Sequence, residues 1–193
     1  MAAAVGHHVE DGAFCYFAYG SNLLPERIHI HNPTAELMGP GVLEGFQLGF
    51  GGPAESRNWH GYPATIREAP GGRVYGALWK VASSDSASLD EQEGVHVPQL
   101  AYNRLEVAVR PLDNASTEAH FPCRTYQLKQ DNGQHGQPSP QYKAVILEGA
   151  RRLGLPAEYV REVEAMPDNG YKGPIGIPLP TFLTHSPLDE TPL

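Results

Sequence analysis

Positive charge and cysteine are both scarce in this sequence. Its 193 residues include 14 Lys and Arg against 22 Asp and Glu, which gives a formal net charge of −8. A chain this acidic, with no run of basic residues, argues against a nucleic-acid binder. Its two cysteines, Cys15 and Cys123, both stand in strand-like apolar surroundings. We therefore expect buried thiols rather than a disulfide or a reactive site, in a reducing cytoplasm.

Long apolar runs and the common cofactor motifs are also missing. Residues 1–8 lack the apolar core of a signal peptide, and no stretch is long enough to span a membrane. No Walker or dinucleotide glycine pattern occurs, and the nine histidines never fall at zinc-like spacing with cysteine or acid. The sequence thus predicts a cytoplasmic protein that binds no membrane, metal or cofactor.

The length fits one domain with one sizeable core. We expect a flexible tail over residues 1–12, a single domain over 13–170 and a proline-rich tail over 171–193. The predicted strands lie at 14–20, 42–50, 62–67, 73–81, 102–111 and 123–128, and the predicted helices at 25–31, 85–93, 140–153 and 156–165. The segment 70–72, Pro-Gly-Gly, is interpreted as a hairpin turn. Short strands with few helices between them favour an α+β fold, a small and mostly antiparallel β-barrel with flanking helices.

The most informative stretch is a buried strand that ends in a tight turn. Residues 14–18 are apolar on both alternating faces, which is typical of a strand buried on both sides. Gly20 then permits a sharp turn, and Ser21 or Asn22 can cap the helix that begins at Pro25. Such a connection aims backbone N–H groups at one point and suits a carboxylate or an oxyanion. An ordinary strand-to-helix connection is the alternative.

One glutamate is a candidate acid–base group. In the predicted helix 85–93, Leu89 is the only large apolar residue, and Glu93 lies one turn later on the same face. Residues 90–92 point elsewhere and are interpreted as solvated. Burial and the negative end of the helix dipole should raise the pKa of Glu93 above its usual value, as in a general acid–base residue. The alternative is a surface charge, or an ion pair with an arginine such as Arg104.

Several blocks of the sequence, taken in order, resemble γ-glutamylcyclotransferases. The resemblance covers about residues 14–166. The Tyr-Gly-Ser-Asn motif with a distant glutamate marks the wider cyclotransferase-like superfamily, and Asp-Glu-Gln-Glu-Gly-Val and Pro-Ser-Pro-Gln-Tyr-Lys are more specific to this family. The matching blocks are 16–24, 26–29, 59–61, 64–66, 88–95, 138–143 and 154–159.

The resemblance implies a small β-barrel enzyme without a cofactor. Such enzymes convert a γ-glutamyl amino acid into 5-oxoproline and the free amino acid. The family's catalytic glutamate matches Glu93, and a tyrosine of its substrate pocket matches Tyr142, which also begins the buried face of its helix. Tyr102 is expected to line the same pocket. The family's substrate loop matches Tyr16, Phe17, Ala18, Tyr19, Gly20, Ser21, Asn22 and Leu23. Family members tend to dimerise, so a homodimer is a further expectation of the resemblance.

Two departures from the family pattern leave alternatives open. Residues 96–101 form a longer stretch than in the nearest family members, and the proline-rich end after Lys172 has no counterpart. One alternative is a related cyclotransferase that cleaves γ-glutamyl amines, such as γ-glutamyl-lysine, or glutathione. Another is a module that binds γ-glutamyl compounds without turnover. An inward Glu93 beside the intact loop counts against the binding module, because a binder has no need of that carboxylate.

Overall fold

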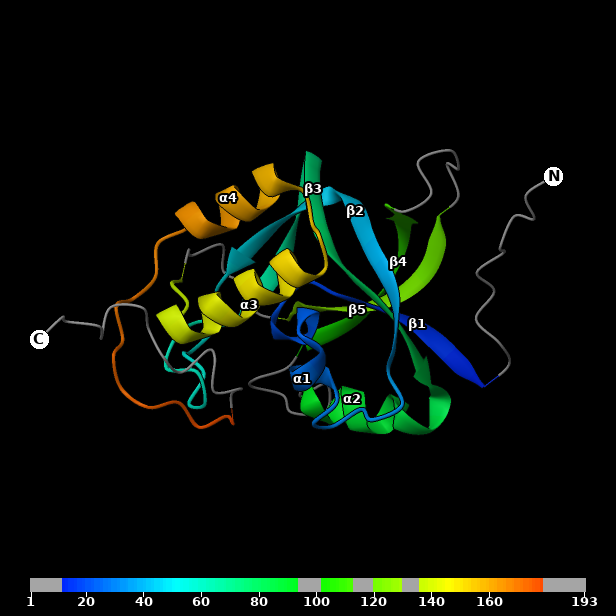
Figure 1. The fold of residues 1–193 in the computed structure, drawn as a ribbon, viewed down its shortest axis with the longest axis horizontal. Coiled ribbons are helices and arrows are strands. Elements are labelled where there is room, and N and C mark those ends of the chain that lie inside the picture. The colour runs from blue at the N-terminus through cyan, green and yellow to red at the C-terminus, as the bar shows by residue number, and fades with distance from the viewer. Residues whose placement is uncertain (1–11, 94–101, 113–119, 130–135, 179–193) are drawn as a thin grey trace, which may run out of the picture.

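The structure is a closed five-stranded β-barrel with helices against it. The computed structural model describes residues 12–93, 102–112, 120–129 and 136–178. Within these ranges the strands follow one another around the barrel in the order β1-β3-β2-β4-β5. Neighbours pair antiparallel except β1 and β5, which close the barrel in parallel. The predicted α+β fold, a mostly antiparallel barrel with flanking helices, is therefore confirmed (Figure 1).

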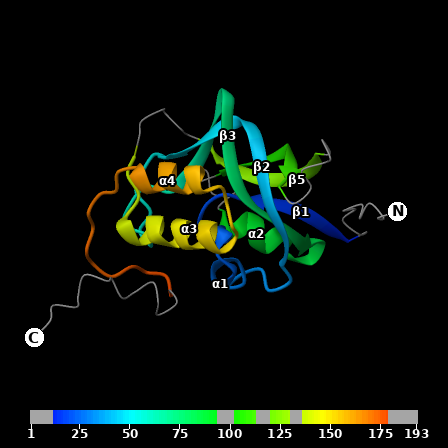
Figure 2. The ribbon, with the colours of Figure 1, turned by 45° about the horizontal axis from the view of Figure 1, so that its top comes forward.

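The elements follow the chain in mixed order. The strands are β1 (Ala13–Ala18), β2 (Glu36–Phe50), β3 (Ala64–Ala82), β4 (Tyr102–Pro111) and β5 (Phe121–Leu128). The helices are α1 (Pro25–Ile28), α2 (Ser86–Gln92), α3 (Pro140–Arg152) and α4 (Ala157–Ala165), with 3₁₀ turns η1 (Ser21–Leu23) and η2 (Ser83–Asp85). Figure 2 shows α3 and α4 stacked on one side of the barrel. Among the described residues, no helix is long and apolar enough to cross a membrane.

The strand β1 and the helix α3 bring the substrate-loop segment into the core. The last four residues of β1 are buried, as its two apolar faces predict. Helix α3 packs on η1 at Gly149, where a Cβ would stand 2.6 Å from the Cβ of Leu23 and 3.0 Å from the backbone nitrogen of Leu24. Only a glycine allows the two backbones to approach this closely. The loop after β1 is therefore clamped between the barrel and α3.

The predicted hairpin at residues 70–72 is wrong. Both flanking segments belong to the single strand β3, and both pair with β2: Glu44 lies opposite Arg73, and Phe46 lies opposite Glu68. The Pro-Gly-Gly segment is thus the bulged part of one long strand, with Gly71 at φ +80°. Turn-forming residues look alike in a hairpin and in a bulge, so the local sequence does not separate the two.

Two further boundaries differ from the prediction by three residues or more. Helix α1 ends at Ile28 rather than His31, and the chain leaves the helix through turns at residues 29–31. Strand β2 begins at Glu36 rather than Val42. Its first part contains Gly39 at φ +136° and a register shift. A glycine inside a strand indicates such an irregularity, so the sequence alone predicts a later start of the strand.

The two cysteines and the proline-rich segment also have definite places. Cys15 and Cys123 are buried free thiols on the adjacent strands β1 and β5, as predicted, with their Sγ atoms 2.8 Å apart. The described residues after α4 form no helix or strand. Part of them packs on the body of the protein, because the Tyr171 ring stacks on His60 with centroids 4.4 Å apart. The expected tail 1–12 lies outside the described residues except for Gly12.

The N-terminal cap of α3 gives a first test. Ser139 is fully buried, and its Oγ accepts a hydrogen bond from the backbone N–H of Tyr142 at 3.2 Å, as the sequence predicts. Ser139→Ala should lower the free energy of unfolding by about 1–2 kcal/mol, because a helix N–H then loses its acceptor in the interior. Urea denaturation measures this. Ser83→Ala, which changes an exposed hydroxyl, is the control and should stay within about 0.5 kcal/mol. An equal loss in both variants would contradict the capping role.

Candidate active site

One pocket collects residues from several elements that are far apart in the sequence. A cavity of about 50 Å³ opens beside the turn that follows β1. Its wall comes from β1, this turn, the start of β3, the end of α2, the strands β4 and β5, and α3. The lining residues are Tyr16, Tyr19, Gly20, Ser21, Asn22, Ala64, Glu93, Tyr102, Tyr126 and Tyr142. Five of these ten are tyrosines, so the cavity is both aromatic and rich in hydroxyl groups.

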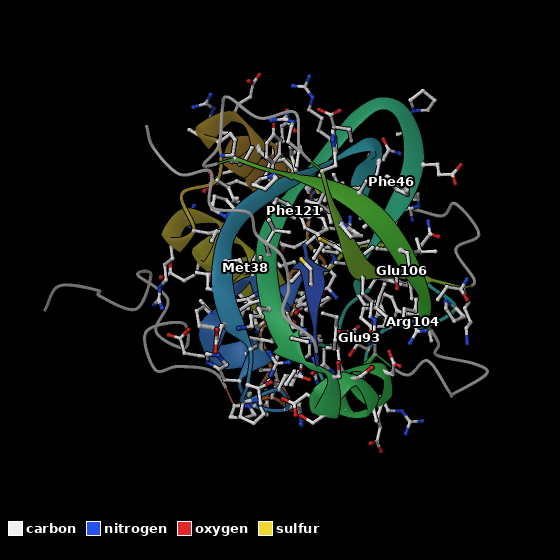
Figure 3. The ribbon with its side chains drawn as sticks, turned by 90° about the vertical axis from the view of Figure 1, so that its right-hand side faces the viewer. Met38, Phe46, Glu93, Arg104, Glu106 and Phe121 are labelled. Atoms are coloured by element: carbon white, nitrogen blue, oxygen red, sulfur yellow. The ribbon has the colours of Figure 1, made fainter. Side chains whose placement is uncertain are left out.

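Glu93 is the carboxylate of this pocket. It caps the C-terminus of α2, where its backbone N–H donates to the Leu89 carbonyl at 3.0 Å. Burial raises the pKa of its side chain from 4.5 to about 7, against the opposing charge of Arg27, and the nearby Asp90 adds to the rise. The predicted upward shift is confirmed. Figure 3 shows Glu93 at the end of α2 and Arg104 on β4. Among the described residues Arg104 pairs with Asp90 at 3.4 Å and not with Glu93, so the alternative of a Glu93–Arg104 ion pair is wrong.

The turn at residues 19–22 is held from both sides. Trp79 Nε1 donates to the Asn22 carbonyl at 3.0 Å. On the other side, a Cβ on Gly20 would stand 3.1 Å from the Tyr142 hydroxyl. Ser21 and Asn22 make no capping hydrogen bond, which corrects that expectation. The Asn22 side chain instead donates to the Tyr16 hydroxyl at 3.2 Å and to Glu93 Oε1 at 3.5 Å, so it links the turn to the carboxylate.

Tyr142 connects α3 to the pocket. Its hydroxyl accepts a hydrogen bond from the backbone N–H of Ala64 at 3.3 Å. Its ring lies against Trp59, with centroids 4.6 Å apart. Burial raises the pKa of this phenol to about 12, so the hydroxyl keeps its proton at neutral pH. Tyr102 also reaches the cavity, and its hydroxyl donates to the Ala64 carbonyl at 2.7 Å.

Three of the predicted site residues lie elsewhere. Phe17, Ala18 and Leu23 are not part of the cavity wall, and their side chains are buried in the core. The alternation along β1 explains the first of these, because Tyr16 faces the pocket and its neighbour Phe17 then faces the opposite side. The other predicted residues, from Tyr16 and Tyr19 to Tyr102 and Tyr142, are brought together with Glu93.

Sequence reasoning missed a second carboxylate and its partner. Asp90, expected to be solvated, is only 8% exposed and accepts a hydrogen bond from the Tyr126 hydroxyl at 2.6 Å. Gln92, also expected in solvent, donates to Asn22 Oδ1 at 3.4 Å. The signal for Tyr126 was weak: it is one of several apolar residues in a predicted strand, and nothing marks which face of that strand meets the site.

Arg27 is an unusual buried cation beside the site. It is 6% exposed, and its guanidinium carbon lies 5.4 Å from the centre of the Trp59 ring. Its Nε has no hydrogen-bond partner within the described part of the chain. Its charge acts on the nearby Glu93 and holds the pKa of that carboxyl lower than burial alone would. In the same ranges, no group of three or more His, Cys, Asp or Glu residues is placed to hold a metal ion.

Comparisons with known proteins agree with this geometry. The AIG2-like family model matches residues 73–163. The gamma-glutamylcyclotransferase of Bos taurus is 44% identical over 169 residues, which cover 86% of each chain. That of Homo sapiens is 40% identical over 168 residues, which cover 86% of this chain and 85% of the relative. The chain belongs to the γ-glutamylcyclotransferase family.

The structural likeness extends over the same region. A solved structure of a gamma-glutamyl cyclotransferase matches with a TM-score of 0.78 at 41% identity, covering 84% of this chain and 93% of that one. The resemblance drawn from the sequence blocks is thus confirmed. In this member of the γ-glutamylcyclotransferase family, the blocks around Tyr19, Glu93 and Tyr142 all meet at one cavity.

The raised pKa of Glu93 has a consequence for stability. Below pH 4.5 the carboxyl is protonated in both the folded and the unfolded chain, and the two states do not differ. Between pH 4.5 and about 7 the unfolded chain releases a proton that the folded protein retains, so the free energy of unfolding falls as the pH rises. Glu93→Gln should remove this fall and be more stable than the wild type at pH 8 by about 2–3 kcal/mol.

Urea denaturation at pH 4.5 and pH 8 tests this expectation. Glu91→Gln is the matched control, because it changes an exposed carboxylate of the same helix. Its difference from the wild type should be small at both pH values. A Glu93→Gln variant that is less stable than the wild type at pH 8 would show that the buried carboxylate is stabilised rather than strained.

Proposed function

We propose that this protein is a cofactor-free cyclotransferase that converts γ-glutamyl amino acids into 5-oxoproline and the free amino acid. One observation carries the proposal: a carboxyl with its pKa raised to about 7 shares a small pocket with the turn at residues 19–22. A group that titrates near neutral pH can take up a proton and later return it. The relatives named for this activity support the assignment of substrate and reaction.

The reaction balances within one substrate molecule. Glu93 first takes a proton from the α-ammonium of the glutamyl group, which frees the lone pair of the nitrogen. This nitrogen then attacks the γ-carbonyl carbon, and a tetrahedral oxyanion forms. When the intermediate collapses, the bond to the leaving nitrogen breaks, and Glu93 gives the proton to that nitrogen. Both reacting atoms belong to one molecule, so a pocket that holds the substrate in a folded shape brings them together. The protein must then supply only proton transfer and stabilisation of the oxyanion.

The turn after β1 supplies the groups for the oxyanion and the carboxylate. In this proposal the backbone amides of residues 20–22 and the hydroxyl of Tyr142 bind the oxygen atoms of the glutamyl group. These contacts need geometry rather than a nucleophile, and Trp79, Gly149 and Tyr142 hold the turn in place. Tyr16, Tyr19, Tyr102 and Asn22 complete the wall around the substrate.

Three narrower expectations belong to the same proposal. The protein acts in the cytoplasm and takes part in the metabolism of glutathione and other γ-glutamyl peptides. It also forms a homodimer, and light scattering coupled to size-exclusion chromatography measures this oligomeric state. The stretch 96–101, which motivated a preference for γ-glutamyl amines or glutathione, lies outside the described residues. Turnover of γ-glutamyl-lysine and glutathione in competition with γ-glutamyl-alanine separates those alternatives.

Release of 5-oxoproline from γ-glutamyl-alanine tests the proposed reaction. The wild type should form product. Its kcat/KM should fall as the pH is lowered below about 7, because Glu93 then becomes protonated and cannot act as a base. Glu93→Gln should keep the fold, because the side chains are nearly isosteric, and lose turnover by a factor on the order of 10²–10⁴. Glu91→Gln serves as the control and should retain activity. Binding of 5-oxoproline by the wild type without any product would instead support the non-catalytic module.

A further inference from the structure

The hydroxyl groups of the pocket are not equivalent, because each phenol has a single proton. The Tyr102 hydroxyl lies 2.7 Å from the carbonyl oxygen of Ala64, and the Tyr19 hydroxyl bonds to the carbonyl oxygen of Tyr126. A carbonyl oxygen carries no hydrogen, so both tyrosines must be the donors. Their own oxygen atoms then have lone pairs and no proton to donate, and the Thr65 side chain occupies one lone pair of the Tyr19 oxygen.

Tyr126 belongs to the same group. Its hydroxyl lies 2.6 Å from Oδ1 of Asp90, and this carboxylate is contacted by Arg104 at 3.4 Å and by Arg124 at 4.0 Å. With two guanidinium groups beside it, Asp90 acts as the acceptor and takes the phenol proton. Tyr126 therefore also offers the cavity an oxygen that only accepts hydrogen bonds.

Two tyrosines have the opposite polarity. The Tyr142 hydroxyl accepts the backbone N–H of Ala64 at 3.3 Å, and the Tyr16 hydroxyl accepts the side-chain amide of Asn22 at 3.2 Å. Neither phenol donates its proton to a group in the described part of the chain. Burial raises the pKa of both phenols, so both protons stay in place at neutral pH and remain free to be donated.

We propose that this division orients the substrate: the oxygens of Tyr19, Tyr102 and Tyr126, together with Glu93, receive its α-ammonium, and the hydroxyl protons of Tyr16 and Tyr142 meet its oxygen atoms. The inference rests on the proposed function and adds to it which end of the glutamyl group lies where. An ammonium has three donors and no acceptor, and it fits a cluster of acceptor-only oxygens. The arrangement also places the amine beside the carboxyl that deprotonates it.

Binding to the inactive Glu93→Gln protein tests the orientation without turnover. Two ligands are compared by calorimetry: γ-glutamyl-alanine and glutaryl-alanine, which is the same molecule without the α-amine. Adding Tyr102→Phe or Tyr126→Phe should lower the affinity for γ-glutamyl-alanine by about three- to tenfold, which is the effect of one lost hydrogen bond. The affinity for glutaryl-alanine should change by less than about twofold. Tyr142→Phe should weaken both ligands, because its partner is present in both.

The controls keep the test decisive. Near-UV circular dichroism shows whether each variant is folded. If Tyr126→Phe or Tyr102→Phe does not fold, Tyr19→Phe replaces it, because the Tyr19 oxygen is the third proposed acceptor and its loss should again weaken the binding of only the ligand with the ammonium. Equal weakening of the two ligands, or none, would overturn the inference. The proposed function fails on a different result, the absence of 5-oxoproline from the wild type.

Discussion

Burial of the Glu93 carboxyl among phenol rings is the constraint on which the site depends. Glu93 ends a short helix inside a wall of tyrosines, and this surrounding disfavours its charged form. The surrounding phenols shield the group from water, and each is itself fixed by a hydrogen bond to the protein. The pocket therefore combines a poorly hydrated interior with few groups that are free to reorient. Such an environment holds the pKa of a carboxyl near neutral pH.

The scaffold meets this demand by joining distant segments through backbone atoms. Ala64, at the start of β3, donates its N–H to Tyr142 and accepts from Tyr102 through its carbonyl. The carbonyl of Tyr126 accepts from Tyr19. Main-chain groups of strands move little, so the aromatic rings hold their positions although they come from four different elements and the turn after β1. Arg27, behind the wall, opposes the desolvation of Glu93 and keeps its pKa from rising further.

The features of the fold and the site that could be predicted from the sequence are those whose cause lies within a few neighbouring residues. The buried strand β1, the cap at Ser139 and the inward Glu93 each carry their signal within a few residues, and each prediction is confirmed. The family resemblance added the link between Glu93 and Tyr142, which spacing alone does not give. The failures depend on remote partners. Asp90 is buried only because Tyr126, Arg104 and Arg124 surround it, and residues 70–72 form a bulge only because β2 continues on both sides.

The parallel pairing that closes the barrel also orders the assembly of the protein. Tyr16 of β1 lies opposite Arg124 of β5, whereas the long pairing of β2 with β3 joins neighbours in the chain. Loop entropy disfavours contacts between residues far apart in sequence, so we expect the β2–β3 pairing to form before the β1–β5 seam. The ring contact between Tyr16 and Tyr126 crosses that seam. The pocket therefore cannot be complete until this seam is closed, because Tyr16 and Tyr126 line it from the two strands.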